Sequence, residues 1–419
     1  MFRDIETLVL SHNLIIMNNS QKTRASRNRG MNIILILLVV VLGIYAYLFF
    51  GFNEDAALTS SKAQLTSCAT TNKYSRLLQC TRWNKLNQVN IINPWDTTKV
   101  LQKYLFVPKN VREANEKKVS DWKHIFHGKV IYTPVERAVI YSSVHCALVV
   151  DLGCVHNIVG VTDAEYIYSP AVRQGLDDGQ IADLGSGLDP NIEKLITLKP
   201  EVLLISPFEY SGGHGRVDKI GIPVIECADY MEVSPLARAE WMKFYGMMFG
   251  KSDVATSLFI NSERAYLDIA HRASSASKRP TVLAETKSSS AWYVPGGRSY
   301  VAGYFKDAGA DYLWADDNRS GSVPVSFETV FKKAKDADFW LFKYNKDKDM
   351  TLDDLKAEYA PYAGFRPYHI KQVYGCNTRY KRYYEDIPFH PERLLANMAH
   401  IFHPEIFESS EYTYFSPLP

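Results

Sequence analysis

Residues 183–206 are DLGSGLDPNIEKLITLKPEVLLIS, which predicts a glycine-rich loop, a short helix and a buried strand. Asp189 stands before a proline, an order typical of a helix N-cap followed by proline in the first turn. Pro200 ends the helix, and the β-rich run at residues 202–205 is too short for another helix. Glu193 lies near the start of the helix, away from its apolar face, so we expect its carboxylate at the surface.

A second unit of the same kind lies at residues 325–342, VSFETVFKKAKDADFWLF. Ser326 is its predicted N-cap, and residues 339–342 form its closing strand. Glu328 occupies the place that Glu193 holds in the first unit, to within two residues. The repeat predicts two lobes of related architecture.

Composition places the chain among ordinary globular proteins. Its 419 residues allow two or more domains, and 46% of them are hydrophobic and 22% charged. The formal net charge of +2 gives no electrostatic case for binding nucleic acid. Aromatic residues are abundant, with 26 Tyr, 20 Phe and 7 Trp, a composition that suits ligand clefts as well as cores.

Residues 33–52 form an uncharged apolar run. Twenty residues at helical rise reach about 30 Å, enough to cross a bilayer. Basic residues precede the run and acidic residues follow it: Lys22, Arg24, Arg27 and Arg29 before, Glu54 and Asp55 after. This charge order predicts that the bulk of the protein lies outside the cytoplasm, on the periplasmic face of the inner membrane. The length of the run favours an uncleaved anchor; cleavage would release the protein into the periplasm.

Cysteine positions leave a second mode of attachment open. Residues 65–68, LTSC, resemble a lipoprotein cleavage box, so lipidation at Cys68 is an alternative to the membrane anchor. Met17 and Met31 are alternative initiators.

The six cysteines include no CxxC pair, which argues against a zinc ribbon and a thioredoxin-like site, and their spacing defines no disulfide.

The rest of the chain alternates strand and helix patterns, which predicts an α/β fold of two lobes, each a mostly parallel sheet covered by helices. A helix from Ser252 to about Ser274, with one continuous apolar stripe, is long enough to join them. The predicted segments are 1–32 (cytoplasmic or leader), 33–52 (membrane anchor or signal), 53–72 (linker), 73–129 (small N-terminal β extension), 130–250 (lobe 1), 251–275 (bridging helix) and 276–419 (lobe 2).

Two α/β lobes joined by one long helix resemble the helical-backbone family of solute-binding proteins, which serve ABC importers of iron–siderophore complexes, haem and cobalamin. The likeness extends over residues 130–405 and rests on an ordered set of motifs. They are RAVIYS at 137–142, IVGVTD at 158–163, NIEKLITLKPEVLLI at 191–205, KIGIPVI at 219–225, YVPGGRSY at 293–300, DAGA at 307–310 and VSFETV at 325–330.

The resemblance implies a role for the two surface carboxylates. In this family one carboxylate per lobe docks into arginine pockets of the membrane permease, and Glu193 and Glu328 match those motif positions. Two charges on rigid helices would let a permease sense lobe closure. The alternative is that both are solvated carboxylates favoured by the helix dipole. The implied partners are an ABC permease with its ATPase, and the protein is expected to be a monomer.

The ligand cleft is expected between the lobes, at the carboxyl ends of the strands. Aromatic rings there would stack on a flat or catecholate ligand, and an arginine would pair with its acidic oxygens. The candidate ligand-binding residues are Tyr141, His145, Tyr166, Phe208, Tyr210, Trp292, Tyr293 and Arg298. We expect no intrinsic cofactor and no protein-held metal, since His145 and His214 are the only histidines placed near the cleft. The transported ligand would be an iron chelate, haem or cobalamin.

Three functions remain open from the sequence. The first is an extracytoplasmic solute-binding protein that delivers its ligand to a permease. The second is a membrane-tethered receptor or sensor of the same fold. An extracytoplasmic α/β enzyme is the least favoured, because the chain has no GxSxG elbow and no HExxH motif.

Overall fold

The computed structural model describes residues 72–83, 86–114, 125–209, 213–408 and 413–419. The predicted leader, the anchor at residues 33–52, nearly all of the linker, the Cys68 box and Tyr210 lie outside the described residues. Within the described part of the chain, no helix is both long enough and apolar enough to cross a membrane.

The predicted N-terminal β extension is a four-stranded sheet with the order β1-β2-β3-β4. Strands β1 (Leu78–Trp83), β2 (Leu86–Ile92) and β3 (Val100–Pro108) form an antiparallel meander, and β4 (Lys129–Thr133) runs parallel to β3. The short helix α3 (Lys109–Ala114) follows β3. Apolar side chains of this sheet, including Tyr104 and Phe106, belong to the same core as lobe 1, with the Phe106 ring 5.7 Å from that of Phe244. The sheet is therefore part of the lobe 1 body.

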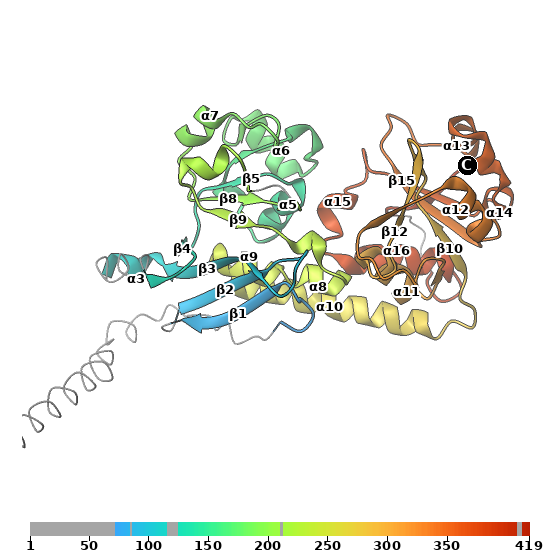
Figure 1. The fold of residues 1–419 in the computed structure, drawn as a ribbon, viewed down its shortest axis with the longest axis horizontal. Helices are drawn as coiled ribbons and strands as arrows, with labels where there is room; N and C mark the ends of the chain where they lie inside the picture. The colour runs from blue at the N-terminus through green and yellow to red at the C-terminus, as the bar shows by residue number, and fades with distance from the viewer. Residues whose placement is uncertain (1–71, 84–85, 115–124, 210–212, 409–412) are drawn as a thin grey trace, which may run out of the picture. The chain divides into compact units, whose positions relative to one another are not determined.

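Lobe 1 contains a five-stranded parallel sheet with the order β7-β6-β5-β8-β9. The strands are β5 (Ala138–Ile140), β6 (Ile158–Val161), β7 (Ala182–Asp183), β8 (Val202–Ile205) and β9 (Val224–Glu226). Both faces are covered, which is why β5, β6 and β8 are continuous apolar runs. Helices α5 (Ser143–Asp151) and α6 (Pro170–Asp177) pack with one set of alternating strand residues, and α7 (Ile192–Thr197) packs with the other. This sheet and its helices are drawn in shades of green in Figure 1.

Lobe 2 is built around a second five-stranded sheet, with the order β13-β10-β15-β16-β17. Strands β10 (Thr281–Ala284), β13 (Asp311–Tyr312), β15 (Phe339–Tyr344) and β16 (Val373–Asn377) are parallel, and β17 (Ser416–Pro417) is antiparallel. A small antiparallel sheet accompanies it, formed by β11 (Lys287–Ser288), β12 (Ala291–Pro295) and β14 (Ser322–Val325). The helices are α11 (Tyr300–Asp307), α12 (Phe327–Ala334), α13 (Leu352–Glu358), α14 (Arg366–His369), α15 (Tyr383–Asp386) and α16 (Pro391–Phe402).

The two lobes repeat one strand order. In the parallel sheet of lobe 1, four neighbouring strands have the order β6-β5-β8-β9, in which the first strand of the lobe, β5, lies between β6 and β8. In lobe 2, β13-β10-β15-β16 have the same arrangement. Helices α7 and α12 each precede the strand beside the first one, β8 and β15 respectively. The repeated helix–strand unit in the sequence thus occupies equivalent places in two related sheets.

The long bridging helix is α10 (Ser252–Ser274), 23 residues in length. Its first half buries Ala255 and Phe259 in the lobe 1 core, whereas Tyr266, farther along, belongs to the lobe 2 core. The region before it forms two short helices, α8 (Pro235–Ala239) and α9 (Met242–Met248). The α/β fold with parallel-sheet lobes is therefore confirmed.

Candidate functional site

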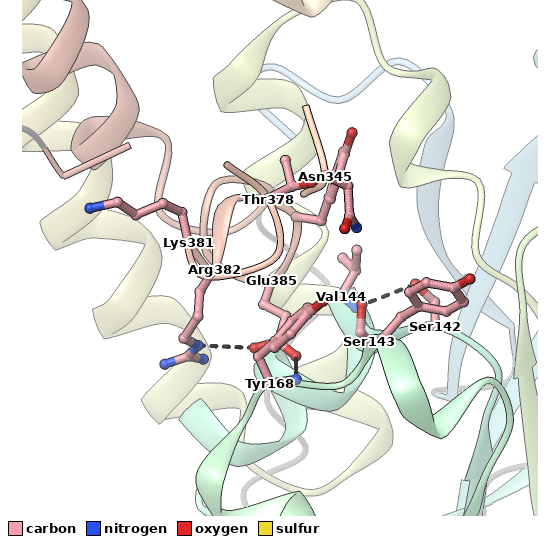
Figure 2. A pocket seen from close by; sticks show the side chains of 11 residues that line it. Ser142, Ser143, Val144, Tyr168, Asn345, Thr378, Lys381, Arg382 and Glu385 are labelled. Carbon is pink, nitrogen blue, oxygen red and sulfur yellow. Dashed lines mark hydrogen bonds and ion pairs between the residues drawn. The ribbon is translucent and has the colours of Figure 1, made fainter. Parts of the chain in front are cut away.

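A cavity of about 480 Å³ lies where the carboxyl ends of strands from both lobes meet; we call it the interlobe cavity. The segments after β5 and β6 line it from lobe 1, and those after β15 and β16 line it from lobe 2, as expected for parallel sheets. Its lining residues are Ser142, Ser143, Val144, Tyr166, Tyr168, Asn345, Thr378, Lys381, Arg382, Tyr384 and Glu385 (Figure 2).

The interlobe cavity combines exposed aromatic rings with basic side chains. Tyr166 is 57% exposed and Tyr384 is 50% exposed, so both rings can contact a ligand. Lys381 and Arg382 add positive charge, and Arg382 Nε donates to Glu385 Oε2 at 2.9 Å. Aromatic surface beside a guanidinium is the chemistry expected for a flat or aromatic ligand with acidic groups.

A second hollow, of about 290 Å³, lies on the carboxyl edge of the lobe 1 sheet; we call it the lobe 1 groove. Tyr141, Leu188 and Phe208 line it, and Leu188 is 91% and Phe208 60% exposed. The Tyr141 hydroxyl is buried and has no hydrogen-bond partner among the described residues. Burial raises the pKa of Tyr141 to about 12, so this hydroxyl stays protonated at neutral pH and can donate to a ligand oxygen.

Three of the predicted ligand contacts thus line cavities at the expected edge. Tyr166 lies at the interlobe cavity, and Tyr141 and Phe208 line the lobe 1 groove. Arg298 instead lines a separate hollow of about 640 Å³, formed mainly by lobe 2 residues that include Arg279 and Lys306, and by residues 233–235 of lobe 1. This hollow shares no lining residue with the interlobe cavity. Tyr293 is 46% exposed on β12 and, within the described chain, lines none of these three hollows.

The prediction of Trp292 as a ligand contact is wrong. Its side chain is fully buried, and its indole N–H donates to the carbonyl of Ala284 at 2.9 Å. The indole packs 5.7 Å from that of Trp340 in the lobe 2 core. Successive strand residues point to opposite faces, so Trp292 faces the core and Tyr293 faces outward.

The prediction of His145 as a ligand contact is also wrong. His145 is 2% exposed, with Nε2 lying 2.8 Å from Asp229 Oδ1. The buried Arg238 completes the network, its Nε donating to Asp229 Oδ2 at 3.1 Å. Burial alone would raise the pKa of Asp229, but His145 and Arg238 hold it below its ordinary value. The network keeps a buried carboxylate ionised within lobe 1.

None of the lobe 2 residues that line the interlobe cavity was predicted from the sequence. Four of the six, Lys381, Arg382, Tyr384 and Glu385, fall in residues 379–386, RYKRYYED, shortly after strand β16. A run rich in tyrosine and basic residues at the carboxyl end of a buried strand is a pattern that could have indicated a ligand site. It was missed because the strand's partner in the cavity, the segment after β6, is more than 200 residues away in sequence.

The two candidate docking carboxylates occupy the same helical position. Asn191 caps α7 and Ser326 caps α12, each side chain accepting a hydrogen bond from a backbone N–H three residues on. The expected cap at Asp189 is therefore wrong, since the helix starts two residues later. Glu193 and Glu328 are both the second helical residue, and both are exposed. Hydrogen bonds from its own backbone N–H and from Ser326 lower the pKa of Glu328, which keeps it ionised.

The described residues contain no group of three metal-ligating side chains suited to hold a metal ion. His214 lies 3.0 Å from Glu226 Oε2, and Glu285 forms an ion pair with Lys343. These carboxylates already have protein partners.

His390, the N-cap of α16, contacts both lobes. Its Nε2 lies 2.9 Å from Asp151 Oδ2 at the end of α5, and its Nδ1 lies 3.4 Å from Glu392 Oε1. Burial would lower the pKa of His390, but the hydrogen bonds to Asp151 and Glu392 outweigh it and raise the pKa to about 9. The imidazolium is therefore the form present at neutral pH.

We expect this histidine to make stability depend on alkaline pH. Its folded pKa of about 9 exceeds the unfolded value of 6.5, so its contribution is complete below pH 6.5 and is lost as pH rises through 9. The full amount is on the order of 3–4 kcal/mol, from about 1.4 kcal/mol per pKa unit. Urea unfolding at pH 6, 7.5 and 9 measures it, and the difference between wild type and His390→Gln isolates this residue. Equal pH dependence in the two proteins would contradict the assignment.

Comparisons with known proteins agree with the architecture. A family model described as periplasmic binding protein matches residues 138–380. An uncharacterized lipoprotein of Methanocaldococcus jannaschii is 27% identical over 344 residues, which cover 78% of this chain and 80% of the relative.

Solved structures share the fold at low sequence identity. A periplasmic haem-binding protein from Pseudomonas aeruginosa has a TM-score of 0.54 at 16% identity, over 68% of this chain and 98% of its own. A possible iron-binding periplasmic solute-binding protein from Staphylococcus epidermidis has a TM-score of 0.52 at 16% identity, over 64% of this chain and 99% of its own. The resemblance predicted from the sequence is confirmed. Because the family model spans residues 138–380 of 419, the chain belongs to the periplasmic binding protein family.

Proposed function

We propose that this protein is an extracytoplasmic solute-binding protein of an ABC importer, which captures an iron complex or a corrinoid between its lobes and delivers it to a membrane permease. The observation that carries the proposal is the matched pair of exposed carboxylates. Glu193 and Glu328 are the second residues of equivalent helices in two lobes that repeat one strand order. The helix dipole also favours a carboxylate in the first turn of either helix, so the effect of charge reversal on import distinguishes docking from that structural role.

The interlobe cavity supports an aromatic, acidic ligand. Tyr166 and Tyr384 offer exposed rings, and Lys381 and Arg382 offer positive charge. In the lobe 1 groove, Tyr141 offers a hydroxyl that has no hydrogen-bond partner among the described residues. Ferric catecholate chelates and haem carry both aromatic planes and acidic oxygens. Two of the fold's neighbours are named for haem and iron, and we extend that cargo class to this chain as part of the proposal.

The proposed site of action is the outer surface of the cytoplasmic membrane. The family is extracytoplasmic, and the M. jannaschii relative is named a lipoprotein. Lipid attachment at Cys68 and retention of residues 33–52 are the two tethers that the sequence offers. The family consists of binding proteins rather than enzymes, so the importer role is preferred over catalysis.

Removing the exposed rings of the interlobe cavity is expected to weaken ligand binding. Tyr166→Ala and Tyr384→Ala should each raise the dissociation constant by on the order of tenfold, since stacking contributes about 1 kcal/mol beyond buried area. The probes are a ferric tris-catecholate, haem and cobalamin, and the readout is quenching of intrinsic fluorescence. The matched control is Tyr380→Ala, because Tyr380 is 61% exposed in the same segment but does not line the cavity. Binding of a probe that survives both cavity variants unchanged would place the site elsewhere.

A further inference from the structure

The segment of residues 383–390, which we call the strap, belongs to lobe 2 by sequence but contacts lobe 1. It contains α15 and leads into α16. Helix α10 is the covalent bridge between the lobes, and the strap lies far from it in sequence. Three side chains of the strap reach lobe 1: Glu385, Phe389 and His390.

Glu385 forms the polar contact. Its Oε1 accepts hydrogen bonds from the backbone N–H groups of Tyr168, at 2.7 Å, and Ser169, at 3.2 Å, at the start of α6 (Figure 2). Its Oε2 accepts from Arg382 Nε at 2.9 Å within the same segment. The Glu385 side chain is 1% exposed, so its charge depends on these donors rather than on water. Separating the lobes would break both hydrogen bonds between Glu385 and the backbone N–H groups of lobe 1.

Phe389 forms the apolar contact. Although it follows the lobe 2 sheet in sequence, its ring is 1% exposed and belongs to the lobe 1 core. It packs edge-on against Tyr245 with ring centroids 6.0 Å apart. Withdrawing this ring from lobe 1 would expose a large apolar side chain and leave a void among its neighbours.

His390 forms the ionic contact, and through it the strap also reaches α10. Its ring lies between Asp151 of α5 and Glu392 of α16. Glu392 in turn accepts a hydrogen bond from the hydroxyl of Ser262, a residue of α10. The end of the strap therefore lies where both lobes and the bridging helix meet.

We propose that the strap is a fixed connection between the lobes in addition to α10 and to α8, whose Leu236 packs in the lobe 2 core, and that it holds the interlobe cavity at a set width before any ligand arrives. One helix alone lets two bodies rock about it, whereas an additional connection made of polar, apolar and ionic contacts restricts that motion. Glu385 and Tyr168 are also lining residues of the cavity, so the strap forms part of the ligand-contacting wall. A cavity held open in this way binds without the entropic cost of ordering the lobes. Only this last consequence rests on the proposed function.

Hydrogen exchange of two amides tests the strap without a ligand. In Glu385→Gln the side chain keeps its shape but loses its charge, so the hydrogen bonds that it accepts from Tyr168 and Ser169 lose their charge assistance and weaken. We expect the amides of Tyr168 and Ser169 to exchange at least about tenfold faster, while those of β5 and β15 stay as in wild type. The matched control is Glu358→Gln, which removes a carboxylate from the surface ion pair with Lys346 in lobe 2. Unchanged protection of Tyr168 and Ser169 in Glu385→Gln would overturn the assignment of Glu385.

Distance measurements test the connection itself. Spin labels on unnatural residues at the exposed positions Arg173 and Lys332 report on lobe 1 and lobe 2 in the full chain. Wild type is expected to give one narrow distance distribution, and both Glu385→Gln and the milder Phe389→Leu a broader one. A broad distribution in wild type, or a narrow one in both variants, would overturn the strap. Because no cargo is used, failure of the proposed import function would leave this result unaffected, and the reverse also holds.

Discussion

Reversing both docking charges, in a Glu193→Arg, Glu328→Arg double variant, is expected to reduce import by at least about 100-fold while the dissociation constant of the ligand stays the same. Both carboxylates are exposed and neither lines the interlobe cavity, so their removal leaves the ligand contacts in place. An interface that receives two anions in arginine pockets would instead meet two cations, and like charges held together across an interface are strongly unfavourable. Uptake of labelled ligand into cells, with binding measured on the purified variant, separates the two effects.

The matched control for this experiment reverses two other exposed carboxylates, one in each lobe. Asp177 ends α6 in lobe 1, and Asp353 lies in the first turn of α13 in lobe 2. An Asp177→Lys, Asp353→Lys variant makes the same change in net charge and should import at the wild-type rate. Each single reversal at Glu193 or Glu328 should lie between wild type and the double variant. Import that survives the double reversal would show that the docking assignment is wrong.

Removing the Glu240 carboxylate is expected to cost about 3–5 kcal/mol of folding free energy. This fully buried group accepts hydrogen bonds from three successive backbone N–H groups: those of Lys73 at 2.9 Å, Tyr74 at 2.8 Å and Ser75 at 2.9 Å. The ammonium of Lys243 also donates to it, at 2.8 Å. In Glu240→Ala these donors lose a common acceptor, and the partly exposed ammonium of Lys243 loses its counter-charge.

Urea unfolding of wild type and Glu240→Ala at neutral pH measures the loss. The comparison variant is Glu263→Gln, because Glu263 pairs with the exposed ammonium of Lys73 in the same region and water screens that interaction. Its unfolding midpoint should stay close to that of wild type. Burial alone would raise the pKa of Glu240, but Lys243 and the three N–H groups lower it, so its contribution is present at neutral pH and is lost on acidification. A Glu240→Ala protein as stable as Glu263→Gln would contradict this account.

The two-lobed architecture could be predicted because it depends on local patterns. The helix-then-strand units around Glu193 and Glu328 have apolar periods and caps that are visible over about twenty residues. The start of α7 was predicted two residues too early, because Asp189 and the proline after it also fit an N-cap. The side chain of Asn191 makes the capping hydrogen bond. The position of each glutamate on its helix depends on that cap, so the structure sharpened an approximate match into an identical one.

The ligand site could be predicted only in part, because cavities depend on which loops tertiary packing brings together. Tyr141, Tyr166 and Phe208 follow lobe 1 strands and reach the expected edge. Trp292 and Tyr293 are adjacent on one strand, so at most one could face a ligand, and burial placed the tryptophan inside. The basic tyrosine-rich segment after β16 was overlooked because its contact with lobe 1 has no local signature.

The repeated strand order has a consequence for recognition. Glu193 and Glu328 lie at equivalent positions, so turning the protein by half a turn would place each carboxylate where the other was. A permease that contacted only these two charges would therefore accept the protein in either orientation. The sheet β1-β2-β3-β4 packs into the core of lobe 1, and the described part of lobe 2 has no counterpart. If a permease receives both carboxylates, this sheet would distinguish the two orientations, because only one of them presents it to a given side of the permease.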